Sequence, residues 1–267
     1  MKNRFKLFAL VIAAATLSLQ CSTDESEVPS VPTSIDEHFK AGSFTLDSRT
    51  LNYQECHFHS SQSGDAALVV VLHGQYANGS DNESQLHQDA MIKIWHLLSS
   101  SNVKAVMLAP QCPTGYEWDE NPQELTRLTM AELLKAMLDN YVKRQPNIDT
   151  SRIYILGYSD AYKPAGAGGV WRMLNEYTDM FAAGMVVAAD PDEAISPSKI
   201  AKTPLMLVKN ESDVYAVSVA IDSFSDLVHD AGGILVEEIV KSGSREELCR
   251  EAFTAERLDW VMQYTKK

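Results

Sequence analysis

Short apolar runs alternate with segments of helical periodicity along most of the chain. Six runs predict strands, and the first of them is continuously apolar, as expected of a strand that is buried on both faces of a sheet. They lie at residues 67–74, 104–110, 152–158, 181–189, 204–210 and 234–240. These runs predict the central strands of the fold.

Between the runs, apolar residues recur every three or four positions, which predicts amphipathic helices. The predicted helices lie at 86–98, 125–141, 168–177, 215–230 and 254–264. Residues 43–60 alternate enough to predict an antiparallel pair at a sheet edge. Strands that alternate with helices predict an α/β fold: a mostly parallel central sheet with helices on both faces, and ligands at the carboxyl ends of the strands.

The first twenty residues have the pattern of a signal peptide. Three basic residues precede an apolar run at 7–17, which is too short to span a bilayer, and Cys21 follows. A cysteine at this place predicts a lipoprotein signal at 1–20, with Cys21 as the lipidated first residue of the mature protein. An ordinary secretory signal is the alternative. Both predict an extracytoplasmic protein, and lipidation predicts anchoring to a bacterial membrane, in the periplasm or on the cell surface.

Composition separates the rest of the chain into a tether and one domain. Residues 21–35 are rich in Ser, Thr, Glu and Pro with almost nothing to bury, which predicts a flexible tether. Residues 36–267 are enough for one large domain. The formal net charge is −13. Residues 1–20 carry basic residues and no acidic ones, so the mature chain is more acidic still. This acidity argues against nucleic acid and against anionic lipid as partners, so the lipid anchor is the only predicted membrane contact.

Three cysteines follow Cys21, and they show no metal-binding spacing. An odd number in an oxidising compartment permits one disulfide, for which we favour Cys112 with Cys249 over a pair that includes Cys56. No cofactor motif is present, and we predict neither a cofactor nor a metal.

Five segments in a fixed order resemble the α/β-hydrolase superfamily. They are VVVLHG followed by ANGSDN, LAPQCPTGYEWDE, DTSRIYILGYS, GGVWRMLNEYTDMFAA and KTPLMLVKNESD. Within that superfamily the chain is similar to secreted esterases of the polyhydroxybutyrate-depolymerase and feruloyl-esterase type, and to prolyl-oligopeptidase-like lipoproteins. The likeness covers roughly residues 43 to 265. It implies a serine hydrolase whose nucleophile, acid and histidine come in that chain order.

The resemblance assigns four positions to the chemistry of ester hydrolysis. Ser159 follows the run at 152–158 at the nucleophile position, and Asp213 stands at the position of the triad acid. The backbone N–H groups of Gln75 and Asp160 stand at the positions that hold the oxyanion. The alternative role of Ser159 and Asp213 is to cap the helices that follow them.

An insertion complicates the serine position. Seven residue steps separate the family serine from the next tryptophan, whereas Ser159 and Trp171 are twelve apart. If the extra residues follow Asp160, the serine keeps its place; if they precede Pro164, proline occupies its site. Ala161 also replaces the second glycine of the G-x-S-x-G pattern, where strand and helix pass closely.

The histidine is missing from its expected position. The loop after 234–240 carries Ser244 there, and no histidine follows His229, which falls in a predicted helix. His73 belongs to the oxyanion loop. Lys163 and Lys241 are alternative bases, but both lie in polar segments that would not lower a lysine pKa.

A second pair of histidines offers a different chemistry. His57 and His59 share one face of a strand and could hold a metal, but the sequence supplies no third ligand, and an exposed edge strand explains them equally well.

These observations leave three hypotheses. The first is a carboxylesterase-like serine hydrolase that acts on an acyl, feruloyl-type or glycan-linked ester. The second is a catalytically inactive hydrolase homologue that binds a glycan or a lipid-like ligand. The third is an interaction scaffold tethered at the membrane. Turnover that disappears in Ser159→Ala separates the first from the others.

Overall fold

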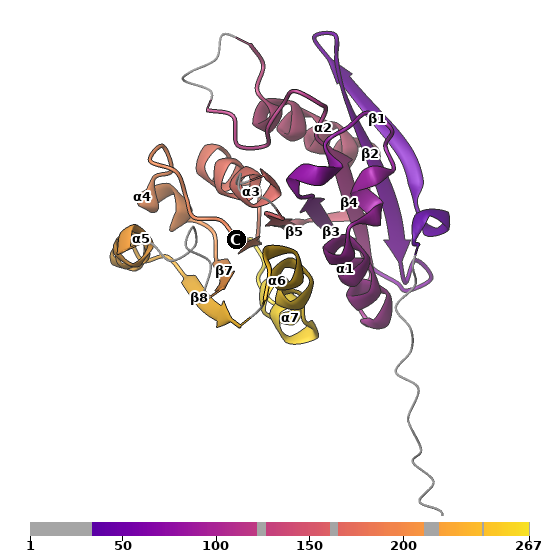
Figure 1. Cartoon of the computed structure of the whole chain (residues 1–267). Coiled ribbons are helices and arrows are strands. Elements are labelled where there is room, and N and C mark those ends of the chain that lie inside the picture. Colours follow the sequence, from indigo (N-terminus) through magenta and orange to yellow (C-terminus); the bar gives the residue numbers. More distant parts are fainter. Residues whose placement is uncertain (1–33, 122–126, 161–164, 211–218, 242, 267) are drawn as a thin grey trace, which may run out of the picture. The chain divides into compact units, whose positions relative to one another are not determined.

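The computed structural model describes residues 34–121, 127–160, 165–210, 219–241 and 243–266, with the backbone alone for 219–222 (Figure 1). Within these residues no helix is long and apolar enough to cross a membrane. The leader, Cys21 and residues 22–33 of the predicted tether lie outside the described residues, as does Asp213. The last two tether residues are described, and Ile35 is fully buried.

An eight-stranded sheet runs through the described chain in the order β1-β2-β4-β3-β5-β6-β7-β8. The strands are β1 (Lys40–Leu46), β2 (Arg49–Phe58), β3 (Ala66–Leu72), β4 (Ala105–Gln111), β5 (Ile148–Tyr158), β6 (Ala183–Val187), β7 (Leu205–Asn210) and β8 (Leu235–Val240). The first two pair antiparallel at one edge, β2 pairs antiparallel with β4, and the remaining neighbours are parallel. The predicted edge pair and the six other predicted strands are confirmed, and β8 forms the second edge of the sheet.

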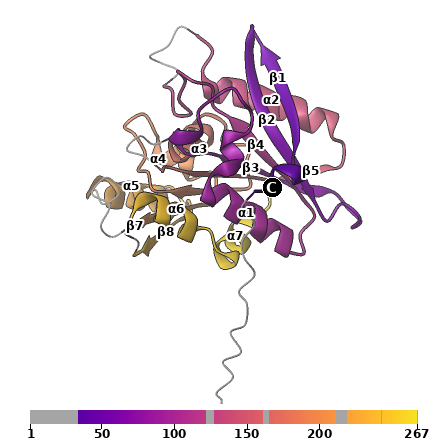
Figure 2. The ribbon, with the colours of Figure 1, turned by 45° about the vertical axis from the view of Figure 1, so that its right-hand side comes forward.

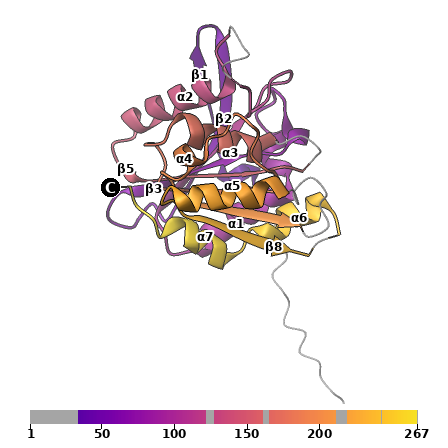
Figure 3. The same cartoon turned by 90° about the vertical axis from the view of Figure 1, so that its left-hand side faces the viewer.

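Helices cover both faces of the sheet. They are α1 (Asp89–Ser100), α2 (Met130–Arg144), α3 (Ala165–Glu176), α4 (Pro197–Ile200), α5 (Val219–Asp230), α6 (Arg245–Ala252) and α7 (Ala255–Met262), with short 3-10 turns η1 (Asp36–His38), η2 (Gln75–Ala77) and η3 (Ser84–His87). One core cluster joins α2, α3, α4 and α5 to the sheet, and a second cluster joins α1, α6 and α7 to the other face (Figures 2 and 3).

Alternation along β3 explains the two cores. Leu68, Val70 and Leu72 point into the first cluster, while Val69 and Val71 point into the second. All five side chains are fully buried, because a central parallel strand has helices on both sides. The continuous apolar run at 67–74 follows from this position in the sheet.

Glycines allow α3 to start directly over β5 and β3. A Cβ added to Gly157 would lie 2.2 Å from the carbonyl oxygen of Gly166, and one added to Gly166 would lie 2.1 Å from the carbonyl oxygen of Leu72. Gly166 therefore supplies the close strand-to-helix approach that Ala161 was expected to obstruct. The helix begins at Ala165, which has a φ of 42°.

The sequence pattern missed α6, which occupies a segment that we expected to be a loop. Its buried residues are only Leu248, Cys249 and Ala252, and charged residues fill most other positions.

The predicted disulfide between Cys112 and Cys249 is absent. The Cys249 thiol lies 3.3 Å from the carbonyl oxygen of Ser159, and the buried Cys112 thiol lies 3.9 Å from that of Pro113.

Candidate active site

Ser159 lies at the carboxyl end of β5, where the sequence placed it, but it is fully buried. Its N–H donates to the carbonyl oxygen of Val187 at 3.1 Å, so the serine continues the pairing of β5 with β6. A nucleophile elbow is a sharp, strained turn that exposes its hydroxyl. Ser159 does not have a positive φ, and the described residue nearest to it along the chain that does is Ala165. The chain therefore carries the serine beyond the strand without the exposed turn.

A guanidinium reaches the Ser159 hydroxyl. Nη1 of Arg245 donates to Oγ of Ser159 at 3.0 Å and to the carbonyl oxygen of Ala188 at 2.9 Å. Arg245 is the first residue of α6, so its side chain projects from the helix end toward the ends of β5 and β6. A guanidinium has five donors and no acceptor, and it keeps its charge in proteins. Arg245 therefore cannot take the serine proton.

Ser244, the predicted histidine position, has a different role. Its exposed side chain accepts from the N–H of Glu247 at 3.1 Å and caps α6. The residue that faces the serine is the next one along the chain. Sequence reasoning missed Arg245 because it sits in a hydrophilic stretch with no periodicity to orient it.

Gln75 and Asp160 are brought together as the oxyanion assignment requires, but a carboxylate lies between their N–H groups. The N–H of Gln75 donates to Oδ1 of Asp160 at 2.7 Å, and Nε2 of Gln88 donates to Oδ2 at 2.5 Å. The backbone N–H groups of Tyr76 and of Asp160 itself also act on this carboxylate and lower its pKa. We call the N–H of Gln75 and Nε2 of Gln88, which donate to the carboxylate, the donor pocket. The Asp160 side chain stands where an oxyanion would need to form.

Gln88 holds the carboxylate in place and had no sequence signal. Its Oε1 accepts from the N–H of Gly74 at 3.0 Å and from the hydroxyl of Tyr158 at 2.6 Å, which leaves Nε2 directed at Asp160. Gly74 is needed here because an added Cβ would lie 2.2 Å from Cγ of Asp160. Burial raises the pKa of Asp160, and the N–H groups around its carboxylate oppose that rise.

His73 is fixed in a structural role below the donor pocket. Nδ1 lies 2.6 Å from the carbonyl oxygen of Gly74, and Nε2 lies 2.9 Å from the backbone nitrogen of Cys112. The backbone N–H must donate to Nε2, so Nδ1 carries the proton and both ring nitrogens are used. Burial lowers the pKa of His73 to about 4, and the ring is neutral near pH 7.

Among the other proposed bases, the described structure places His229 away from the serine. His229 lies at the end of α5, where Nε2 is 2.9 Å from the carbonyl oxygen of Leu235. Lys241 is exposed beyond β8, and Lys163 lies outside the described residues. Nε2 of His57 lies 3.9 Å from Oε1 of Glu55, in a strand that is flanked on both sides and is therefore not an edge. The described ranges hold no group of three side chains that could bind a metal ion.

Comparison with solved structures places this sheet in a known fold. A thermostable esterase matches with a TM-score of 0.72 and 20% identity, over 86% of this chain and 64% of the esterase. A ferulic acid esterase matches with a TM-score of 0.63 and 12% identity, over 84% of this chain and 98% of that one. Est1E from Butyrivibrio proteoclasticus gives 0.55 and 12%, with 84% and 96% coverage. No family model and no curated protein sequence matches.

The chain has the α/β-hydrolase fold. This confirms the predicted fold class. At 20% identity and below, the similarity concerns architecture, and the chain spans slightly less than two thirds of the thermostable esterase.

An acidic cleft opens beside the site, between the loops that follow β4 and β6 of the α/β-hydrolase sheet. It has a volume of about 460 Å³. Its lining includes Glu117, Asp119, Glu120, Asn121, Arg127, Asp192 and Glu193. Burial first, and then the carboxylates of Glu117 and Asp192, raise the pKa of Asp119 to about 6, although Arg172 opposes the rise.

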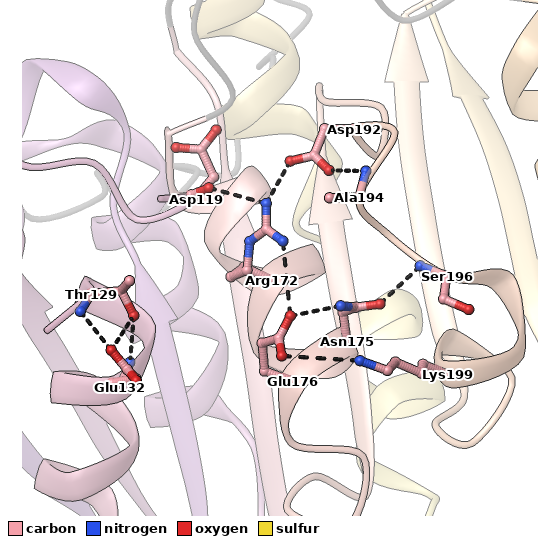
Figure 4. Close-up of polar contacts among 10 residues, drawn as sticks. All are labelled: Asp119, Thr129, Glu132, Arg172, Asn175, Glu176, Asp192, Ala194, Ser196 and Lys199. Atoms are coloured by element: carbon pink, nitrogen blue, oxygen red, sulfur yellow. Dashed lines mark hydrogen bonds and ion pairs between the residues drawn. The ribbon is translucent and has the colours of Figure 1, made fainter. Parts of the chain in front are cut away.

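Arg172 joins the two loops that border the cleft. Its side chain is 1% exposed, and Nη2 donates to Oδ2 of Asp192 at 2.7 Å and to the carbonyl oxygen of Asp119 at 3.3 Å. Figure 4 shows the guanidinium between these loops, with the Asp119 carboxylate pointing away from it. This contact fixes the walls of the cleft.

Proposed function

We propose that this chain is a catalytically inactive α/β-hydrolase-fold lipoprotein of esterase type, which binds a ligand outside the cytoplasm without cleaving it. The contact between Arg245 and Ser159 carries the proposal. A serine hydrolase needs an acceptor at this place to take the hydroxyl proton, and the guanidinium supplies a donor.

The magnitude of this loss decides between an esterase and an inactive homologue. In serine hydrolases that use a triad, removal of the histidine costs on the order of 10⁶ in turnover, and binding with the oxyanion donors retains roughly 10³ to 10⁴ over water. Here Asp160 also occupies the donor pocket, so this residual contribution is suppressed as well. The two departures act on different parts of the reaction and support the same conclusion.

The location is part of the proposal. We infer that residues 1–20 are removed, that lipidated Cys21 anchors the protein to a bacterial membrane, and that residues 21–35 act as a tether. The order of basic residues, apolar run and cysteine supports this inference. Incorporation of a palmitate label into the wild-type chain and its absence in Cys21→Ala would test it.

The described cleft favours a polar ligand over a lipid. Its lining is rich in carboxylates, with one asparagine and one arginine, and carboxylate oxygens accept hydrogen bonds from hydroxyl groups. A glycan offers such hydroxyls, whereas an acyl chain needs an apolar wall. We therefore favour a glycan, free or carrying an ester, among the ligand classes that the sequence suggested.

The full-length protein in detergent would be incubated with p-nitrophenyl acetate, methyl ferulate and a fluorophosphonate probe. We expect neither turnover nor labelling that differs from Ser159→Ala. Mass spectrometry of the labelled protein identifies the modified residue. Labelling confined to Ser159 together with turnover that Ser159→Ala abolishes would refute the inactive assignment and restore the esterase hypothesis.

A further inference from the structure

In the donor pocket two N–H groups donate to one carboxylate, the backbone N–H of Gln75 and Nε2 of Gln88. The backbone N–H groups of Tyr76 and Asp160 also favour the charged carboxylate, since they lower its pKa. Converging backbone N–H groups of this kind form a concave anion site. The anion in this case belongs to the chain itself.

The fit between carboxylate and pocket is close on every described side. Oδ1 and Oδ2 of Asp160 each accept a separate donor, at 2.7 Å from Gln75 and 2.5 Å from Gln88. The Cα of Gly74 closes the third side, where even one added carbon would lie 2.2 Å from Cγ. The carboxylate therefore uses both donors, and neither is open to a second ligand while Asp160 is in place.

Gln88 shows that the pocket is oriented for an anion. Its amide could point either way, but Oε1 accepts from the N–H of Gly74 and the hydroxyl of Tyr158. These two donors fix the amide so that its NH₂ group faces the pocket. A carboxylate offers one oxygen to each of the two donors of the pocket, and its charge strengthens both hydrogen bonds.

We propose that the donor pocket is a carboxylate-binding site occupied by Asp160 from within the chain, which closes it to external acids and to ester carbonyl groups. A small organic carboxylate then binds in the pocket once the Asp160 side chain is removed. This inference deepens the proposed function, since it names the contact that closes the site. It is tested by binding alone, so its outcome does not depend on whether the protein turns over esters.

Acetate is the probe because it is the fragment that Asp160→Gly deletes. The full-length variant would be labelled with ¹⁵N-glutamine and ¹⁵N-tyrosine, and Gln75→Ala would assign the Gln75 amide. We expect the Gln75 and Tyr76 amide signals to move away from their wild-type positions in Asp160→Gly. Titration with acetate should return them toward those positions in a saturable manner. Acetamide should bind about tenfold more weakly, since charge-assisted hydrogen bonds are stronger than neutral ones.

Matched variants separate the pocket from general effects. In the wild-type chain and in Asp160→Asn, the pocket stays filled, so neither should show a saturable response to acetate. Asp230→Ala removes an exposed aspartate at the end of α5 and should behave as wild type. Asp160→Ala with formate repeats the test if the glycine variant does not fold. A folded Asp160→Gly or Asp160→Ala whose Gln75 amide ignores the matching acid would overturn the proposal, as would saturable acetate binding to the wild-type chain at this amide.

Discussion

Nη1 of Arg245 lies 3.0 Å from Oγ of Ser159, and the first residue of a short helix thereby reaches the end of a central strand 86 positions earlier in the chain. A hydrolase places an imidazole at such a contact, because imidazole can accept a proton near neutral pH. Arginine still contacts the serine hydroxyl, but it cannot accept the hydroxyl proton. The donor pocket beside it is filled by Asp160 in a similar way.

Two features prevent ester hydrolysis, Arg245 in place of a base and Asp160 in the donor pocket, and both must be changed before activity appears. We predict that Arg245→His alone and Asp160→Gly alone leave p-nitrophenyl acetate hydrolysis at background, because each leaves the other feature in place. The double variant should exceed both by about 10²-fold, the low end of what a general base contributes. Initial rates of the full-length proteins measure this.

Ser159→Ala in the double variant is the control, and it should return the rate to background. A single Asp160→Gly whose activity depends on Ser159 would contradict the prediction. It would reveal a base elsewhere in the chain, outside the contact with Arg245.

The fold was predictable from the sequence and the state of the site was not. Buried strands and amphipathic helices leave periodic patterns, and β3 and α1 follow from them with small shifts at their ends. Segment order also placed Ser159 at the end of β5 and Gln75 opposite Asp160. Backbone positions follow from such reasoning, because hydrophobic burial fixes them.

Side-chain orientations at the strand ends were outside the reach of that reasoning. Nothing in the sequence says that the Asp160 carboxylate turns back onto the N–H groups that it was expected to flank, since this depends on Gln88 and Gly74 in three dimensions. The helix α6 is so hydrophilic that no periodicity marked it. The missing histidine was therefore sought at Ser244, one residue from the side chain that faces the serine.

Loss of Arg245 should destabilise the fold more than it changes any activity. In Arg245→Met, Oγ of Ser159 and the carbonyl oxygen of Ala188 lose a donor in a buried region. A buried acceptor that loses its donor costs about 1–3 kcal/mol, so the free energy of unfolding should fall by that amount. Urea denaturation followed by tryptophan fluorescence measures it. Arg250→Met, an exposed arginine on the same helix, is the control, and an equal loss there would contradict the specific role of Arg245.

Gly74 and Asp160 should be energetically coupled. Gly74 has a φ of −70°, which alanine adopts freely, so the cost of Gly74→Ala comes from the clash with the Asp160 carboxylate. Forcing a methyl group into such a filled space costs about 1–3 kcal/mol. In the Asp160→Gly background the same substitution should cost much less. A double-mutant cycle of unfolding free energies measures the difference, and strictly additive effects would show that the two residues do not touch.

Asp119 and His73 titrate in the same pH range with opposite effects on stability. The pKa of Asp119 is raised by burial to about 6, so between about pH 4 and 6 the native state binds more protons than the unfolded state, and this group lowers stability as pH rises. The pKa of His73 is lowered to about 4, so between about pH 6.5 and 4 this group lowers stability as pH falls. The dependence of wild-type stability on pH contains both contributions. Comparing the wild-type protein with a variant that lacks one of the two groups isolates that group's contribution.

Asp119→Asn should therefore have a higher free energy of unfolding than the wild-type protein at pH 7, and this advantage should be small at pH 4. The substitution removes a carboxylate that is ionised at neutral pH beside Glu117 and Asp192, and it changes little at pH 4, where Asp119 is already protonated. A rise of the pKa from 3.8 to about 6 bounds the effect at roughly 3 kcal/mol, since one pKa unit corresponds to about 1.4 kcal/mol. Urea denaturation of both proteins at pH 4, 5, 6 and 7 gives the difference. An advantage of the variant that is the same at every pH would contradict the assignment, because an uncharged packing effect does not titrate.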